Sequence, residues 1–323
     1  MPQDIIYLSA QDVRSVAPSM SDVIDAVERM FCEKAAGSVE MPPKPGIHPS
    51  EDAFIHAMPA YIPALRAAGM KWVSAYPSNP AAGLPQIAGL IILNDPDTGL
   101  PTAILDAAWI TAARTAAASA LAARYLASPS SAVLGVLGCG VQGRSHLEAM
   151  AMRFPIREVL AYDTRPERAA RYAEEMAAVH GLPIRTVDAP RAAVAESDMV
   201  VTAGPITRPP HATIRRDWVR RGAFATSVDF ASYWSREALR RFDRLVTDDL
   251  PQFAEYREAG YFEGMPEPGC ELASLVTGAA TGRGDEDERA FCCNLGLAAE
   301  DVAVAPLVVR AAMDRGVGDR LPR

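Results

Sequence analysis

A glycine pattern is the segment of this sequence whose residue types and spacing most clearly suggest chemistry. It follows the apolar run 133–137 and precedes a helical pattern. A first glycine permits a tight turn, a second lets the backbone approach a pyrophosphate, and a third lets helix and strand pack closely. Free amides at the helix N-terminus would then face the phosphates. The segment, which predicts a dinucleotide-binding turn, consists of Gly138, Cys139, Gly140, Val141, Gln142 and Gly143.

An acidic residue ends the next apolar run. Asp163 follows the strand pattern 158–162. It lies about 20 residues past the glycines, where an acid hydrogen-bonds the ribose hydroxyls of a bound dinucleotide. A carboxylate there would repel a 2′-phosphate, which favours NAD over NADP. Arg165 would instead accommodate that phosphate, so NADP stays an alternative, and Thr164 completes the segment predicted to contact the cofactor.

Two basic residues lie within patterns that are otherwise apolar. By strand alternation Lys71 shares a face with Val73 and Ala75, and Arg114 lies on the apolar stripe of the helical pattern 108–127. A cation on an apolar face needs an anionic partner, and an arginine can grip a carboxylate with two hydrogen bonds. The alternatives are an edge-strand lysine with its ammonium in water, and a structural ion pair of Arg114 with an acid elsewhere.

The elements that must position these residues begin with a helix and a set of strands. Apolar residues at 3.6 spacing predict one helix over 9–36. Residues 95–99 predict a turn in which a glycine supplies the backbone angle that other residues avoid. The strands expected in this antiparallel region are 54–59, 70–75, 87–93 and 102–105.

After a break at 128–131, strand and helix patterns alternate. This alternation predicts an α/β fold, a Rossmann doubly wound parallel sheet, joined to an α+β substrate and dimerisation domain. We expect residues 129–297 to form the Rossmann domain, and residues 1–128 with 298–323 to form the other. Cys292 and Cys293 are expected on a helix or loop. The predicted strands are 132–137, 158–162, 184–187, 199–203, 223–228 and 245–247, and the predicted helices 141–154, 166–180 and 298–315.

Composition excludes several classes of function. The net charge of the 323 residues is −8 and no basic run interleaves with aromatics, which argues against nucleic acid or an anionic membrane as partner. No stretch reaches the ~18 uncharged apolar residues that indicate a transmembrane helix. The five cysteines form no C-x-x-C pair, so neither a disulfide framework nor a metal site is indicated. A reduced, cytoplasmic compartment fits this pattern.

Taken together, these motifs resemble the ornithine cyclodeaminase/mu-crystallin family over nearly the whole chain. The resemblance implies NAD(P)-dependent hydride transfer at the α carbon of an amino or imino acid, and homodimers formed through the first domain. Lys71 and Arg114 would hold the substrate carboxylate. Lys44 lies near a position where the family often has arginine, and the alternative for it is a solvated loop lysine. The segments that carry the resemblance are 70–73, 83–85, 97–101, 113–117, 137–142 and 296–302.

Two departures from the family pattern bear on the substrate. The catalytic aspartate of the cyclodeaminases aligns with Ala231, and Asp229 is our candidate for moving a proton at the substrate nitrogen; the alternative is a strand-end acid that caps a turn. Cyclodeaminases that grip a second amine carry an acid where this chain has His56. A histidine there does not favour a second ammonium, and a core or interface histidine is the alternative.

The sequence therefore predicts an NAD(H)-dependent oxidoreductase that moves a hydride at the α carbon of a small amino or imino acid. It would be an imine reductase or an amino-acid dehydrogenase acting on alanine-like substrates or on iminosuccinate and aspartate. One alternative is an ornithine cyclodeaminase that forms proline and ammonia. Another is a crystallin-like protein that binds NAD(P) without catalysis. The expected partners are the small substrate and a second copy of the chain, without nucleic acid, membrane or metal.

Overall fold

The computed structural model describes residues 4–50 and 53–322, which divide into two compact units. One unit comprises Met1–Arg114 with Leu297–Arg323, and the other Thr115–Gly296. The first division falls inside helix α3 (Ala108–Leu126), whereas the sequence predicted it at the break after residue 128. The second half of α3 belongs to the second unit because its side chains bond there, as the hydrogen bonds of Ser119 show below.

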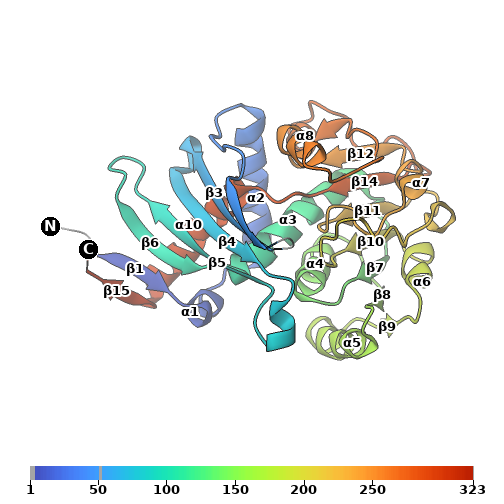
Figure 1. The fold of residues 1–323 in the computed structure, drawn as a ribbon, viewed down its shortest axis with the longest axis horizontal. Coiled ribbons are helices and arrows are strands. Elements are labelled where there is room, and N and C mark those ends of the chain that lie inside the picture. Colours follow the sequence, from blue (N-terminus) through green and yellow to red (C-terminus); the bar gives the residue numbers. More distant parts are fainter. Residues whose placement is uncertain (1–3, 51–52, 323) are drawn as a thin grey trace. The chain divides into compact units, whose positions relative to one another are not determined.

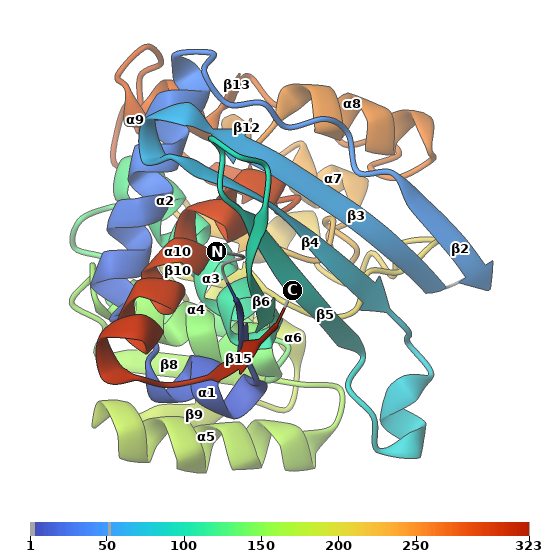
Figure 2. The same ribbon diagram turned by 90° about the vertical axis from the view of Figure 1, so that its left-hand side faces the viewer.

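The first unit is built on a seven-stranded sheet in the order β15-β1-β6-β5-β4-β3-β2. The neighbours β3 to β6 pair antiparallel, as the sequence predicted, while β1 pairs parallel with β6. Side chains alternate between the two faces, and helix α10 (Ala298–Arg315) lies against one of them (Figure 2). The strands are β1 (Ile5–Leu8), β2 (Gly46–Ser50), β3 (Ala53–Ile62), β4 (Ala67–Ala75), β5 (Ile87–Asn94), β6 (Pro101–Asp106) and β15 (Asp319–Leu321).

The helices of this unit correct one prediction. The single helix expected over 9–36 is wrong, because the chain forms α1 (Ala10–Ser15) and α2 (Met20–Ala35). Pro18 disfavours helical backbone in the residue before it. Ser19 then caps α2: its hydroxyl accepts a hydrogen bond from the backbone N–H of Asp22 at 3.2 Å. The unit also holds the start of α3, α10 (Ala298–Arg315), and 3-10 turns at Pro63–Leu65 and Asn79–Ala82.

The second unit contains an eight-stranded sheet in the order β13-β12-β14-β11-β10-β7-β8-β9, with parallel neighbours throughout (Figure 1). The predicted Rossmann sheet is confirmed. Strands β8 and β9 extend from β7 on one side, and β11, β14, β12 and β13 extend from β10 on the other, so the strand order reverses between β7 and β10. The strands are β7 (Val133–Leu137), β8 (Glu158–Tyr162), β9 (Ile184–Thr186), β10 (Met199–Thr202), β11 (Phe224–Ser227), β12 (Arg244–Thr247), β13 (Cys270–Glu271) and β14 (Ala290–Cys293).

Strand β14 corrects a second prediction. Cys292 and Cys293 lie on this strand rather than on a helix or loop, and both are fully buried between β11 and β12. Central strands of a parallel sheet are covered on both faces and tolerate two adjacent thiols as small apolar groups. The helices here are α4 (Val141–Ala151), α5 (Pro166–His180), α6 (Pro190–Ala195), α7 (Arg236–Leu239), α8 (Leu250–Glu258) and α9 (Leu272–Val276), with a 3-10 turn at Arg216–Trp218.

Within residues 4–50 and 53–322, none of the helices has both the length and the hydropathy that a membrane span requires.

Candidate functional site

The glycine turn between β7 and α4 has one crowded side and one open side. Gly138 has a φ of 103°, and a Cβ atom there would lie 2.6 Å from the carbonyl oxygen of Ala203, so the position requires glycine. A Cβ atom on Gly143 would collide with the backbone of Gly138, which shows how closely α4 packs on the turn. At Gly140, by contrast, a Cβ atom would meet nothing within 4 Å. The turn thus leaves open space where a ligand can approach its backbone.

The position of this turn in the sheet also fits a dinucleotide. Gly138 follows β7 and Ala203 follows β10, so the turn lies where the strand order reverses, the place where open α/β sheets bind ligands. Helix α4 begins after Gly140 without a side-chain cap. Val141 is exposed and Gln142 is half-buried. Because an uncapped N-terminus carries free amides and a positive dipole end, it suits a pyrophosphate.

Asp163 is tied to the glycine turn by its own carboxylate. One oxygen accepts a hydrogen bond from the N–H of Cys139 at 3.0 Å, and the other accepts one from the N–H of Arg165 at 3.0 Å. These bonds hold the acid beside the turn at the end of β8. Thr164 and Arg165 are exposed. The structure therefore brings together the predicted cofactor residues of β7, α4 and β8.

A buried histidine that the sequence analysis missed braces the first turn of α4. His146 donates through Nδ1 to the carbonyl oxygen of Gln142 at 2.7 Å, and its Nε2 accepts a hydrogen bond from the Ser119 hydroxyl at 2.9 Å. Asn294 donates to the same hydroxyl at 2.8 Å and Thr226 at 3.3 Å. Burial lowers the pKa of His146 to about 4, so the ring is neutral at neutral pH. Its spacing of one helical turn from Gln142 was the available signal.

Asp229 lies at the end of β11, where the strand stops and the backbone turns. Its carboxylate is fully buried and accepts hydrogen bonds from Ser227 Oγ at 2.6 Å, Thr202 Oγ1 at 3.1 Å and the N–H of Gly204 at 3.2 Å. Burial nevertheless raises its pKa to about 6. Ala231 has a φ of 54°, so β11 does not continue to that position. Asp229 thus holds this turn and also lies beside Gly204, which follows the same strand end as Ala203.

Lys71 is buried in the interior of the first sheet. Strand β4 lies between β3 and β5, which removes the edge-strand alternative. The lysine side chain is 1% exposed, and its Nζ lies 2.5 Å from an oxygen of Asp301. It also donates to Thr111 Oγ1 at 3.4 Å. The anionic partner that the sequence required is therefore present on helix α10.

Arg114 reaches the same helix. Its Nε donates to the second oxygen of Asp301 at 3.1 Å, and its Nη1 donates to Glu300 at 2.5 Å. All three side chains are buried. Asp301 therefore bridges two cations, and Arg114 has the ion pair that the sequence kept as an alternative. Glu300 and Asp301 were missed, although two adjacent acids within the apolar pattern of 298–308 signal a requirement for cationic partners.

Lys44 and His56 belong to the same electrostatic neighbourhood. Burial lowers the pKa of Lys71 to about 7, with nearby Arg114 and Lys44 lowering it further and Asp301 opposing them. Burial, with Lys44 beside it, lowers the pKa of His56 to about 4, so this ring is neutral. It stacks on Phe54 at 4.1 Å between ring centres. We call Lys44, Lys71, Arg114, Glu300 and Asp301 the ion cluster; it carries one net positive charge when Lys71 is protonated.

Comparison with known proteins identifies the family. The family model of the ornithine cyclodeaminase/mu-crystallin family matches residues 4–316. The chain belongs to this family. It is 35% identical over 316 residues to the nodulation efficiency protein NfeD of Rhizobium meliloti, covering 97% of each chain.

Two solved structures are similar over their full length. One is the Δ1-pyrroline-2-carboxylate reductase of Thermococcus litoralis in complex with NADH and L-proline, with a TM-score of 0.90 and 35% identity over 98% of this chain and 99% of that one. The other is an archaeal alanine dehydrogenase dimer with bound NAD, with a TM-score of 0.88 and 32% identity over 99% of each chain. The predicted family is confirmed, and these relatives support the predicted class of NAD-dependent oxidoreductases acting on C=N or CH–NH2 groups.

Proposed function

We propose that the protein is an NAD(H)-dependent oxidoreductase that moves a hydride at the α carbon of a small amino or imino acid. The observation that carries the proposal is the ion cluster, in which Lys71 and Arg114 are buried cations, in a chain whose second unit presents a Rossmann glycine turn. The first unit would hold the substrate carboxylate and the second the dinucleotide. A protein that only stores a nucleotide has no use for buried cations held at this cost in desolvation.

The cofactor in this proposal is NAD. Gly138, Gly140 and Gly143 would seat the pyrophosphate with the first amides of α4, and the carboxylate of Asp163 would meet the ribose hydroxyls. That carboxylate lies in the loop where a 2′-phosphate would fall, which disfavours NADP. Exposed Arg165 is the residue that would oppose this preference. When bound, NADH supplies the hydride.

The chain's own side chains would bind and orient the substrate and handle its proton. Lys71 and Arg114, with Lys44, would neutralise the carboxylate and fix the direction of the α carbon. The net charge of the ion cluster suits one carboxylate. Asp229 would take or give a proton at the substrate nitrogen, because a carboxyl whose pKa is about 6 exchanges protons readily near neutrality.

The substrate side chain is expected to be small and uncharged or acidic. At the place where a second ammonium would need a buried acid, this chain has neutral His56. The similarity to a pyrroline-2-carboxylate reductase and to an alanine dehydrogenase favours a cyclic imino acid or the imine of pyruvate over ornithine.

A second copy of the chain is part of the proposal. Tyr61, Trp72 and Leu90 are 36%, 44% and 42% exposed. Trp72 pairs with Leu90 across β4 and β5, so both lie on the sheet face opposite the one that carries Lys71. An exposed apolar face of this kind fits a homodimer, the state of the similar alanine dehydrogenase. Light scattering should give twice the chain mass, and Trp72→Glu should lower it to that of a monomer.

The cellular compartment completes the proposal. The five cysteines are free thiols in the structure. Unpaired thiols suit a reducing compartment, which supports the cytoplasm that the sequence favoured.

A side-by-side assay tests the proposed reaction. NADH consumption is followed with Δ1-pyrroline-2-carboxylate, with pyruvate plus ammonia and with iminosuccinate, while proline formation from ornithine is measured at matched concentrations. We expect NADH turnover with at least one imino acid and little proline from ornithine. Efficient proline formation would establish the cyclodeaminase alternative, and NADH binding without turnover of any substrate would favour the crystallin-like one.

A further inference from the structure

Asp301 occupies an unusual position in the ion cluster, because it is a single carboxylate between two cations. We propose that Asp301 is a positioning residue that keeps Lys71 charged and aligned beside Arg114, so that helix α10 controls the anion-binding capacity of the site. The inference rests on the proposed function, in which Lys71 and Arg114 hold the substrate carboxylate. It assigns a role to an acid that contacts the substrate-binding cations rather than the substrate.

Each carboxylate oxygen of Asp301 contacts a different cation. One lies 2.5 Å from Lys71 Nζ, and the other accepts from Arg114 Nε at 3.1 Å. Lys71 and Arg114 carry like charges and repel each other. Both side chains are buried, and the low dielectric constant of the interior strengthens this repulsion. A carboxylate between them offsets the repulsion and fixes both directions at once.

The surroundings leave Lys71 dependent on this one acid. The other charged or titratable groups facing it are Arg114 from α3 and Lys44 from the segment before β2, and both disfavour its protonation. His56 on β3 lies on the same sheet face and is neutral. The remaining acid of the cluster, Glu300, pairs with Arg114.

Helix α10 provides a rigid base for this arrangement. Glu300 and Asp301 lie in its first turn, where the positive end of the helix dipole stabilises acids. Glu300 also accepts a hydrogen bond from the N–H of Leu297 at 3.3 Å, which ties the start of the helix. Both acids are fully buried, so water cannot replace Lys71 and Arg114 as the hydrogen-bond partners of Asp301.

Glu300 is the matched control. It has the same charge and burial as Asp301 and lies on the same helical turn, but its cation is a guanidinium, which stays charged at every working pH. Glu300→Gln should weaken the hold on Arg114 without discharging Lys71. Asp301→Asn removes the acid that favours the charged form of Lys71 in its described surroundings. The ammonium should then lose its proton at a lower pH.

The sequence permits a direct measurement of that proton. It contains three lysines, Lys34, Lys44 and Lys71. In protein labelled with ¹³C at lysine Cε, a pH titration by NMR should show three signals, and the one absent from Lys71→Arg belongs to Lys71. We expect its midpoint near neutral pH in the wild type, about 1–3 pH units lower in Asp301→Asn, and much closer to the wild-type value in Glu300→Gln. Equal midpoints in the wild type and Asp301→Asn would overturn the proposal.

Kinetics supply a second readout that a merely structural acid would not move. Lys71 is charged below its midpoint, so Asp301→Asn should raise KM for the imino acid at pH 7 and recover as the pH falls below the new midpoint. The Kd for NADH should stay within about twofold, which also shows that the variant is folded. If KM rises equally at every pH, Asp301 acts only on the fold and the proposal fails.

Three further variants keep the outcomes separable. If Asp301→Asn does not fold, Asp301→Glu keeps the charge but displaces it by one methylene, and a smaller fall in the midpoint with a raised KM is expected. A wild-type midpoint and KM in that variant would contradict the inference. The NMR titration needs no substrate, so normal turnover in Lys71→Met and Arg114→Met would overturn the proposed function while leaving the titration result intact.

Discussion

Two buried polar clusters of the molecule, one in each unit, are built from opposite kinds of group. In the first unit the ion cluster consists of full charges, and Lys71, Arg114 and Asp301 depend on one another. In the second unit the network around His146 consists of neutral groups, in which Ser119 and Asn294 supply the hydrogen bonds. Charges can attract a charged ligand and titrate near neutrality, whereas a neutral network can only fix the backbone. The contrast matches the substrate role that we propose for the ion cluster and the cofactor role that we propose for the glycine turn beside His146.

The same contrast predicts different energetic penalties. Removing one member of a buried ion pair leaves an uncompensated charge in a medium that solvates it poorly. Removing one member of a neutral network leaves an unsatisfied dipole, which is less costly. Substitutions in the ion cluster should therefore have the larger effects on both stability and substrate turnover.

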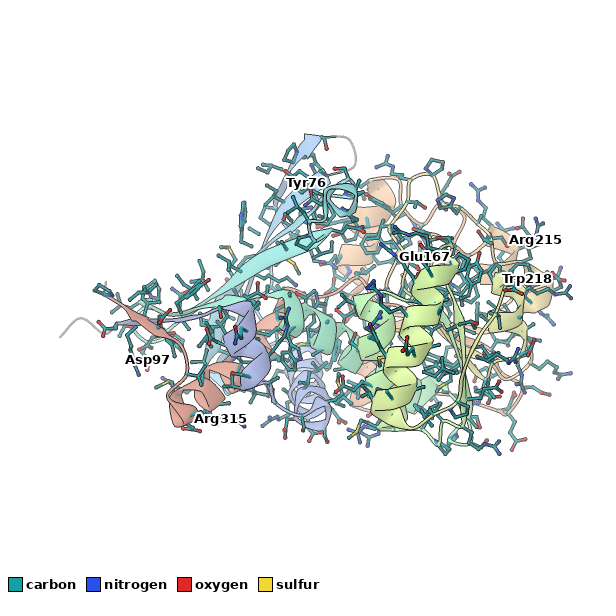
Figure 3. The ribbon with its side chains drawn as sticks, turned by 90° about the horizontal axis from the view of Figure 1, so that it is seen from below. Tyr76, Asp97, Glu167, Arg215, Trp218 and Arg315 are labelled. Atoms are coloured by element: carbon teal, nitrogen blue, oxygen red, sulfur yellow. The ribbon has the colours of Figure 1, made fainter. Side chains whose placement is uncertain are left out.

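The largest effect is expected for Arg114→Met, which leaves Glu300 without a cation and Asp301 with one. The free energy of unfolding should fall by about 3–5 kcal/mol, and turnover of the imino acid should be lost. Urea unfolding and the NADH assay measure the two quantities. Arg66→Met is the control, because Arg66 pairs with Asp97, labelled in Figure 3, at the exposed turn between β5 and β6. The unfolding curve of Arg66→Met should overlay that of the wild type. If Arg66→Met and Arg114→Met lose equal free energy of unfolding, the buried ion pairs are no more important for stability than an exposed one.

An intermediate effect is expected for His146→Leu. It removes the brace on Gln142 and should reduce the free energy of unfolding at pH 7 by about 1–3 kcal/mol. The Kd for NADH should rise about 2- to 10-fold with KM for the imino acid unchanged. Ser145→Ala is the control, because Ser145 also bonds the carbonyl of Gln142, at 3.2 Å, but does not titrate.

The pH dependence of this variant has a defined sign. The pKa of His146 is about 4 in the folded protein and 6.5 in the unfolded chain. Between these values the unfolded state binds the extra proton, so His146 destabilises the wild type as the pH falls from 6.5 to 4. The stability gap between wild type and His146→Leu should narrow by about 2–3 kcal/mol over that range. A gap that stays constant would mean that the ring is not a buried neutral group.

The smallest effect is expected for Asp163→Ser, which changes the second unit at its surface. The preference for NAD over NADP, measured as the ratio of kcat/KM values, should fall about tenfold, equivalent to about 1.4 kcal/mol. Arg165→Ser should increase the same preference. A wild-type enzyme that prefers NADP by an order of magnitude would show that Arg165 outweighs Asp163.

The second unit was the easier one to predict from the sequence. Its signals are local: the glycine turn follows a strand, and Asp163 ends the next strand, so order along the chain sets their proximity. The break between α1 and α2 also has a local signal, which is Pro18 followed by the cap of Ser19 and Asp22. The regular apolar spacing across 9–36 nevertheless led to the prediction of a single helix. Hydrophobic periodicity alone does not record where a helix is interrupted.

The ion cluster of the first unit was only half predictable. Lys71 and Arg114 were recognisable because a cation on an apolar face requires an anion. The identity of that anion was not, because Arg114 and Asp301 are 187 residues apart and meet only when α10 packs on the sheet. The sequence pattern shows that each buried cation needs an anionic partner, but it does not identify that partner. The roles of all five residues in the reaction remain predictions: Lys44, His56, Lys71, Arg114 and Asp229.

Turnover and cofactor binding measured on the same variants decide whether Lys71 and Arg114 serve the reaction. NADH oxidation with Δ1-pyrroline-2-carboxylate, pyruvate plus ammonia and iminosuccinate is recorded for the wild type, Lys71→Met and Arg114→Met, together with the Kd for NADH by fluorescence. We expect turnover in the wild type and its loss in both variants, with NADH affinity within about twofold. Undiminished turnover in both variants, or no turnover of any imino acid by a wild type that binds NADH, would contradict the proposed function.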